Sequence, residues 1–245
     1  MAQNVKNVLV GAANIFISIG NGNARPDTSV VGSVDIAWTA TQSTAAYLNG
    51  ATTKWRSVGY TNQGFEVSYE PGYGEVMVDQ LLDAARLFKQ TLKIMLKTEL
   101  TEGTLENMNL VFGQSDAYTT YTATGTSATS TNTLAVATGS TTSTANATLN
   151  LAAGALGDYP VERSLIAVGN VPANIGSDRS PVDASGTTKK ERVYIARRIV
   201  QMQTTAHALK RDGATVFPVQ FRCLPDDNDI YDGKEYGIII DRIYG

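Results

Sequence analysis

The sequence is poor in the residues that most catalytic and metal sites need. Its 245 residues include one cysteine, Cys223, and one histidine, His207. A single cysteine excludes an intrachain disulfide and a zinc site built on cysteines. Charged residues make up only 18% of the chain, below the roughly one quarter that is typical of soluble domains. The formal net charge is -3 and no basic run occurs, which argues against tight nucleic-acid binding.

Long apolar runs are missing as well. A membrane-spanning helix needs about 20 mostly apolar residues in succession, and no stretch of this sequence approaches that length. The opening residues 1–11 lack the longer apolar core of a secretory signal. We therefore expect the chain to fold in a cytoplasm and to make no membrane contact.

Three features invite a chemical role, and each has a plainer interpretation. His207 has no neighbouring Asp or Ser pattern of a nucleophilic site, so we expect a structural histidine in a strand. Cys223 alternates within an apolar strand pattern, which indicates a buried and inert thiol. The acidic run 226–233 places Ile230 and Tyr231 where a calcium loop needs oxygen ligands, so we expect a solvated turn. The sequence thus predicts no enzyme, no cofactor and no metal.

What the sequence does contain is alternation of apolar and polar residues, which predicts strands. The predicted strands cover residues 8–10, 15–19, 92–100, 163–168, 192–200, 203–209, 216–224 and 235–243. A principal helix is predicted over residues 101–112, with Thr101 as its cap and Leu105, Met108 and Phe112 on its buried face. Leu81, Leu82, Ala85 and Phe88 recur at helical spacing and predict a short helix over residues 80–89.

The clearest strand pair is predicted around the dipeptide Pro71-Gly72. Phe65, Val67 and Tyr69 alternate with polar residues before it, and similar alternation resumes after Gly74. We expect two strands joined by a turn at residues 71–74, with one apolar face and one mostly acidic face. The acidic face would carry Glu66, Ser68, Glu70, Glu75, Met77 and Asp79. A solvated outer sheet face is the simpler interpretation, and a channel wall is the alternative.

Two long segments lack periodicity within what we expect to be one domain over residues 1–245. Residues 27–55 are polar and contain glycine, which is typical of a loop or arm that orders on contact. Residues 117–157 contain no charged residue and are mostly Thr, Ser, Ala and Gly. This segment cannot bury enough apolar surface to fold alone, so we expect an inserted loop, or a small hairpin that pairs residues 134–136 with 149–151.

Several short motifs occur in an order that resembles the major tail proteins of long-tailed bacteriophages, particularly those of actinobacterial hosts. The motifs are WRSVGYTNQGF at 55–65, EVMVDQ at 75–80, TEGTLENM at 101–108, ERSLIAVG at 162–169, and the closing stretches 217–226 and 235–241. The resemblance covers most of residues 55–241. The insertion at 117–157 has no place in the family pattern, and the segment before Trp55 follows it only loosely.

The resemblance implies a mainly β fold with one principal α-helix, in which two packed antiparallel sheets carry long loops. It also implies that copies of the chain form rings, usually hexameric, which stack into the tail tube of the virion after synthesis in the host cytoplasm. DNA passes through such a tube without specific binding, and a tape measure protein and a tail terminator are the partners that the family implies.

Under this hypothesis two sets of residues gain a role. The acidic hairpin face would line the lumen, through Glu66, Ser68, Glu70, Glu75, Met77 and Asp79. The segment 27–55 would stack one ring on the next, through Asp27, Val31, Asp35, Trp38 and Tyr47.

Two other classes of protein stay open at this stage. One is a different virion structural protein, such as a capsid or decoration protein, which would form no rings or tubes. The other is a surface carbohydrate-binding β-domain. Such a domain exposes clustered aromatic side chains, and Tyr118, Tyr121 and Tyr159 are the nearest candidates in this sequence.

Overall fold

The described residues form a mainly β protein with one helix, as the sequence predicts. The structure is a computed structural model, which describes residues 13–19, 55–79, 83–115, 119–124, 144–170, 189–203, 206–208, 211, 213–228 and 232–244. Its strands are β1 (Asn14–Ser18), β2 (Trp55–Ser57), β3 (Thr61–Val76), β4 (Arg86–Leu100), β5 (Thr119–Thr124), β6 (Thr144–Leu149), β7 (Glu162–Asn170), β8 (Lys189–Gln201), β9 (Phe217–Leu224) and β10 (Gly237–Tyr244), and its helix is α1 (Leu105–Val111).

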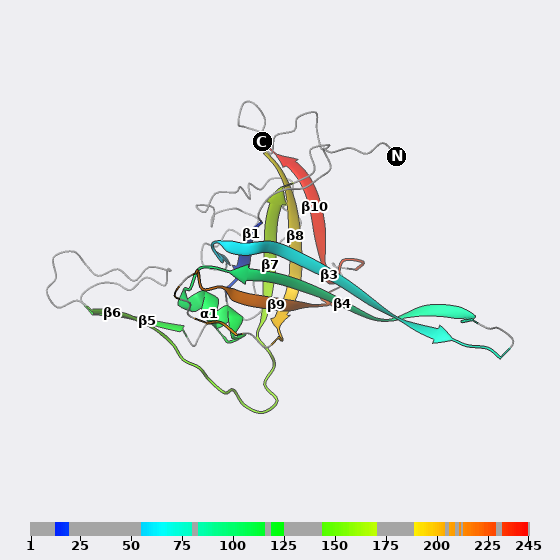
Figure 1. The fold of residues 1–245 in the computed structure, drawn as a ribbon, viewed down its shortest axis with the longest axis horizontal. Helices are drawn as coiled ribbons and strands as arrows, with labels where there is room; N and C mark the ends of the chain where they lie inside the picture. The colour runs from blue at the N-terminus through cyan, green and yellow to red at the C-terminus, as the bar shows by residue number, and fades with distance from the viewer. Residues whose placement is uncertain are drawn as a thin grey trace.

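Eight of these strands form one antiparallel sheet that divides at β8. The strand order is β2-β1-β7-β8-β9-β4-β3, and β10 also pairs with β8. The first part of β8 pairs with β10, whereas its last part, from Arg198 to Gln201, pairs with β9. The sheet therefore bends into two layers, one around β1, β7, β8 and β10, and a second of β3, β4 and β9 that crosses the first (Figure 1). The two packed sheets that the sequence predicts are two layers of one hydrogen-bonded sheet.

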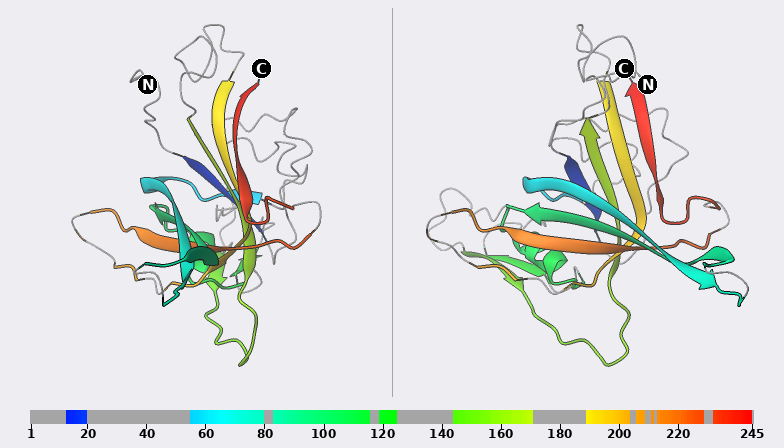
Figure 2. Two further views of the ribbon diagram at one scale, coloured as in Figure 1. Left: turned by 90° about the vertical axis from the view of Figure 1, so that its right-hand side faces the viewer. Right: turned by 45° about the vertical axis from the view of Figure 1, so that its right-hand side comes forward.

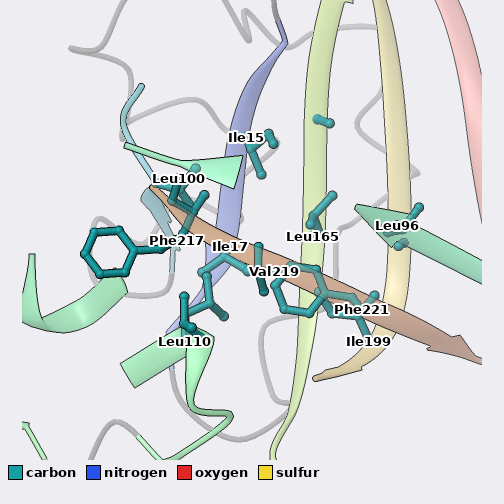
Figure 3. Close-up of a cluster of buried hydrophobic side chains, with 14 of the residues drawn as sticks. Ile15, Ile17, Leu96, Leu100, Leu110, Leu165, Ile199, Phe217, Val219 and Phe221 are labelled. Atoms are coloured by element: carbon teal, nitrogen blue, oxygen red, sulfur yellow. The ribbon is translucent and has the colours of Figure 1, made fainter. Parts of the chain in front are cut away.

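The core lies where the two layers meet. β9 shows why the sequence folds this way, because its residues alternate strictly between buried and half-buried positions along the strand. The labelled core side chains in Figure 3 are Ile15, Ile17, Leu165 and Ile199 from the first layer, Leu96, Leu100, Phe217, Val219 and Phe221 from the second, and Leu110 from α1. Full burial of each such side chain contributes about 1.5–3 kcal/mol, so this cluster is the main source of stability among the described residues.

The helix is shorter than predicted and turned about its axis. Thr104 is the N-cap, and its side chain accepts a hydrogen bond from the Asn107 amide at 3.3 Å. Thr101, the predicted cap, instead donates its hydroxyl to the Tyr60 carbonyl at 2.9 Å. Gly113 follows the helix with a φ of +65°, as expected for the residue that ends it.

The predicted apolar face of this helix is only partly right, because Met108 packs against the core. The buried residues are Asn107, Asn109, Leu110 and Val111, whereas Phe112 is exposed. The physical reason is that two asparagine side chains find backbone partners below the helix. Asn107 donates to the Val58 carbonyl, and Asn109 donates to the Ser115 carbonyl. The spacing of apolar residues cannot predict the burial of polar residues, because these are buried through their hydrogen bonds.

Other sequence predictions also need correction. Residues 86–89 of the predicted helix 80–89 belong to β4, because they pair with Tyr73–Val76 of β3. The described residues of the predicted strand 203–209 form no strand. Of the predicted pairing of residues 134–136 with 149–151, residues 134–136 lie outside the described residues. Leu149 pairs with Thr119 in a separate two-stranded sheet of β5 and β6, which lies beside α1. The predicted strand 8–10 lies outside the described residues.

Candidate assembly surfaces

The most distinctive element is a long ribbon of β3 and β4 whose outer half projects from the body (Figures 1 and 2). β9 pairs with β4 only between Met95 and Leu100. In the described part of the chain, Arg86–Ile94 of β4 therefore pairs only with Tyr69–Val76 of β3. We call these two stretches the arm. A two-stranded ribbon on its own is at best marginally stable in water, so an arm of this length needs further contacts.

The ribbon corrects the predicted turn at residues 71–74. β3 runs without a break through Pro71-Gly72, and the chain reverses only between Val76 and Arg86. Proline is tolerated in this strand because β3 is an edge strand, where a missing N–H costs no ladder bond. Gly72 and Gly74 leave room for cross-strand neighbours, since a Cβ at these positions would lie 2.3 Å from Thr91 Oγ1 and 2.5 Å from Phe88 Cζ.

The continuous strand also changes which residues share a face. Side chains alternate along a strand, so Glu66, Ser68 and Glu70 lie on one face of β3. Glu75 lies on the other face with Tyr73, and the expectation that it shares a face with Glu66 is wrong. Met77 and Asp79 follow the end of β3 and are exposed in the connection to β4.

The face that carries Glu66, Ser68 and Glu70 has charges of both signs, and we call it the polar face. Glu66 is the register partner of Lys97, and Glu70 is the partner of Lys93. Lys97 Nζ donates to Glu66 Oε1 at 3.4 Å, and Ser68 Oγ donates to Glu70 Oε1 at 3.0 Å. Both ends of the Glu66–Lys97 pair are exposed, so the pair stabilises the ribbon only slightly.

The predicted turn at residues 71–74 pairs the two halves of β3 with each other, so the predicted face contains the glutamates without Lys93 and Lys97. The true partner was already visible as a strand over residues 92–100, in which Lys93 and Lys97 recur at a spacing of four. Two lysines and two glutamates at the same spacing on separate strands are a signal for cross-strand pairing.

The opposite face of the ribbon is apolar at its root, and farther out it carries Tyr73 and Leu87 beside Glu75 and Lys89. We call it the apolar stripe. At its root, Phe65 packs edge-on against Tyr194 with ring centroids 5.8 Å apart. Farther out the stripe is open to solvent, with exposed fractions of 58% for Tyr69, 61% for Tyr73 and 60% for Leu87. Lys89 Nζ donates to Tyr69 Oη at 2.9 Å, a bond that raises the pKa of this lysine. The Lys89–Tyr69 contact ties the two strands of the arm together.

An apolar groove of about 290 Å³ lies between the root of the stripe and the strands β8 and β10. Its walls include Val67, Tyr69 and Ile94 from the ribbon, and Tyr194, Ile238 and Ile239 from β8 and β10. Ile239 is 61% exposed. Next to Tyr194 and Ile239 along the same strands, Arg192 Nη2 donates to Asp241 Oδ2 at 2.6 Å, and this pairing raises the arginine pKa.

In the eight-stranded sheet, β2, β3 and β10 each have one edge that no described strand pairs with. Open edges present unpaired N–H and C=O groups, which favour pairing with another chain.

The remaining predicted sites give no common cluster. Cys223 is buried in β9, as predicted, and burial raises its thiol pKa to about 12. His207 is exposed outside any strand, and its ring lies 4.9 Å from that of Phe217 and 6.1 Å from that of Phe112. Asp226, expected in a solvated turn, is buried, and its amide donates to the Glu235 carbonyl.

Several predicted residues fall where side chains are not described. The proposed stacking residues Asp27, Val31, Asp35, Trp38 and Tyr47 lie outside the described residues, as does Tyr118. Tyr121 lies on β5, and only Tyr159 of the three tyrosines has a described side chain, which is 94% exposed. The tyrosine cluster of the carbohydrate-binding alternative is therefore not assembled by the described residues.

Neither the described residues nor the comparisons with known proteins indicate a metal site, a membrane span or a family. Among the described residues there is no group of three His, Cys, Asp or Glu side chains that could hold a metal ion. The one described helix is too short and too polar to cross a membrane. No protein-family model and no curated protein matches the sequence.

Proposed function

We propose that this chain is the structural subunit of a bacteriophage tail tube. Copies would assemble into rings, usually hexameric in the family that the sequence resembles, and the rings would stack into a tube through which DNA leaves the virion. The observation that carries the proposal is the β3–β4 ribbon, which has one polar face, one apolar face and an open outer edge. The motif order of residues 55–241 supports it independently.

The ribbon suits assembly because each of its features is costly in an isolated subunit. An open edge strand favours uncontrolled pairing, and a ring of identical subunits removes that liability by closing on itself. An exposed apolar stripe is a typical protein interaction site. A barrel made from many strands leaves an aqueous channel, so a closed ring of ribbons can enclose a lumen.

The polar face is the surface that we assign to the lumen. Glu66, Ser68 and Glu70 would line it together with Lys93 and Lys97, and Glu75 would not, since it lies on the opposite face. Met77 and Asp79 would lie at the end of the arm, beyond the paired strands. A wall on which each carboxylate faces an ammonium group offers DNA phosphates no net cationic surface, so it releases few counterions and does not hold the DNA.

The test is electron microscopy of the purified chain in negative stain, with the mass of the particles measured by light scattering. We expect rings with a central hole and tubes of constant diameter. A monodisperse monomer at high protein concentration would contradict the proposal. Particles that are shells rather than tubes would favour the capsid or decoration alternative. Co-purification with the tape measure protein and the tail terminator of the same virion would test the two partners that the family implies.

A further inference from the structure

We infer that the arm of one copy docks in the apolar groove of a neighbouring copy of the same chain. This inference rests on the proposed function, because it names the contact by which subunits of a ring would hold each other. The first observation is the surface of the arm itself. Beyond the root of the ribbon, Tyr73, Val76, Leu87 and Phe88 are all exposed, although they are large and apolar.

The chain's own described residues do not cover these side chains. The arm points away from the body in Figure 1 and in the right-hand view of Figure 2, and β9 stops pairing with β4 at Met95. The stretch Arg86–Ile94 reaches roughly 30 Å beyond that point at about 3.3 Å per residue. An apolar projection of this length is suited to contacting a separate molecule.

The groove has the properties of a matching acceptor. Tyr194, Ile238 and Ile239 give it an apolar floor, and Ile239 remains largely exposed. The charges beside them, Arg192 and Asp241, are already paired with each other. A segment that covers the groove therefore buries apolar surface without leaving an unpaired charge, which is the costly event at an interface.

The occupant that fits best is a second copy, because one chain carries both surfaces. The arm and the groove are different patches, so each copy gives its arm to one neighbour and receives an arm from the other. Contacts of this head-to-tail kind close into rings when the rotation between copies allows it. The arm carries charges of both signs, so successive arms do not repel one another strongly: these residues are Glu70, Glu75, Arg86, Lys89 and Lys93.

The first experiment uses two complementary variants of the full chain. The arm variant is Tyr73→Ser with Leu87→Ser, and the groove variant is Ile239→Glu. All three positions are exposed, so both variants should fold like the wild type, which circular dichroism checks. We expect each variant alone to remain monomeric. An equimolar mixture should give heterodimers and nothing larger, because only the arm of the groove variant and the groove of the arm variant remain intact.

The second experiment is a disulfide cross-link. Leu87→Cys in one copy and Ile239→Cys in another should cross-link under mild oxidation, while the buried Cys223 stays unreactive. Leu156→Cys is the control: Leu156 is more exposed than Leu87 but lies in the loop before β7, so it should not cross-link to Ile239→Cys.

The outcomes separate this inference from the proposed function. Wild-type rings or tubes without the 87–239 cross-link, or ring formation by either variant alone, would overturn the docking contact and leave the tube proposal intact. The same result would follow if the groove were filled by residues 27–55 of its own chain. Specific cross-linked heterodimers from a wild-type protein that never forms rings would support the docking contact and contradict the tube.

Discussion

Asn107 is the residue that ties α1 to the segments that follow β2 and β4. It is 1% exposed, and its Nδ2 donates to the carbonyls of Val58 and Glu102 at 2.9 Å each. Its Oδ1 accepts from Arg56 Nη1 at 2.6 Å. Nothing in the helical periodicity of the sequence distinguishes this asparagine from a surface one, because its burial depends on backbone carbonyls that are remote in sequence.

Asn107→Ala should therefore be among the most damaging single changes in the molecule. It leaves two carbonyls and a guanidinium without these partners in a place that water cannot easily reach, so we expect a loss of about 3 kcal/mol in the free energy of unfolding. Asn62→Ala is the control, because the Asn62 side chain bonds Glu99 at an exposed position, and it should cost under about 0.5 kcal/mol. Urea denaturation of both variants measures the difference, and equal losses would contradict the role of Asn107.

Gly237 occupies the position at which β10 begins and lies against β8. Its φ is +149°, and a Cβ there would lie 2.0 Å from the Ile195 carbonyl oxygen. That oxygen belongs to the backbone of a paired strand and cannot move aside cheaply. We expect Gly237→Ala to cost about 3 kcal/mol or more, as backbone strain and overpacking combine.

A Gly233→Ala variant separates backbone strain from overpacking as causes of the loss in stability. Gly233 has a positive φ of +74° but open space around its missing Cβ, so only conformational strain of about 1–2 kcal/mol applies. The difference between the two melting curves then measures the packing contribution at Gly237. A Gly233 variant as unstable as the Gly237 variant would show that close packing against Ile195 is unimportant.

At the scale of elements, the apolar pattern predicted the strands that pack on the core: β9 is buried at every second position, whereas β1 and β7 are apolar stretches with consecutive buried residues. β1, β7, β8, β9 and β10 were all found within a few residues of their bounds. The arm was not, since its distal strands lie outside the core and their pattern follows from pairing with each other. Residues 80–89 have helical spacing, yet Arg86–Lys89 pair with β3. Tertiary pairing overrides local propensity there.

The face assignment failed for a related reason. A turn at 71–74 would have reversed the chain and returned Glu75 to the side of Glu66, whereas a continuous strand places these two residues on opposite faces. A displaced turn therefore changes the apparent charge of a surface. The acidic face expected from β3 alone is a mixed face once β4 is paired with it.

A charge-swap series tests the polar face as a unit. Glu66→Lys with Glu70→Lys would gather four lysines opposite one another, so we expect a loss of about 0.5–2 kcal/mol and a gain in DNA binding that is strongest at low salt. Adding Lys93→Glu and Lys97→Glu restores alternation and should recover most of the stability and abolish the DNA binding. Denaturation and a DNA filter-binding assay at two salt concentrations measure both effects. A double variant that binds no DNA at low salt would contradict the assigned cross-strand neighbours.

The pairing of β5 with β6 brings the two ends of the insertion together, so the insertion can be deleted and its ends joined by a short link. Thr119 and Leu149 are register partners, so the chain enters and leaves the hairpin at neighbouring positions. Replacing residues 119–149 with a short Gly-Ser link should leave the fold intact and, under the tail-tube proposal, should leave ring formation intact. Thermal melting and electron microscopy check the two claims. A folded variant that no longer assembles would make this hairpin an assembly element instead of a peripheral one.

At the scale of the whole molecule, the division of the sheet at β8 explains how one small domain offers several separate surfaces. The strand leaves its first layer with β10 on one edge and enters the second layer with β9 on the same edge. The groove is lined by residues of the ribbon, β8 and β10, and Cys223 of β9 also borders it. Each surface can therefore be altered without disturbing the core, which under the tail-tube proposal would make contacts within a ring separable from contacts between rings.

The segment 27–55 provides the test of that separation. Ser18 of β1 and Trp55 of β2 are register partners, so the chain between them departs and returns at one place on the sheet. Removing residues 27–50 shortens this closed loop and should change the stability of the subunit by no more than about 1 kcal/mol, since closure entropy depends weakly on length.

If Asp27, Val31, Asp35, Trp38 and Tyr47 stack one ring on the next, the shortened chain should give single rings and no tubes. A full-length chain with Trp38→Ser and Tyr47→Ser separates side-chain contacts from loop length, and it should also stack poorly. Electron microscopy scores rings against tubes in both variants, and tubes of normal length from the shortened chain would exclude this segment from stacking.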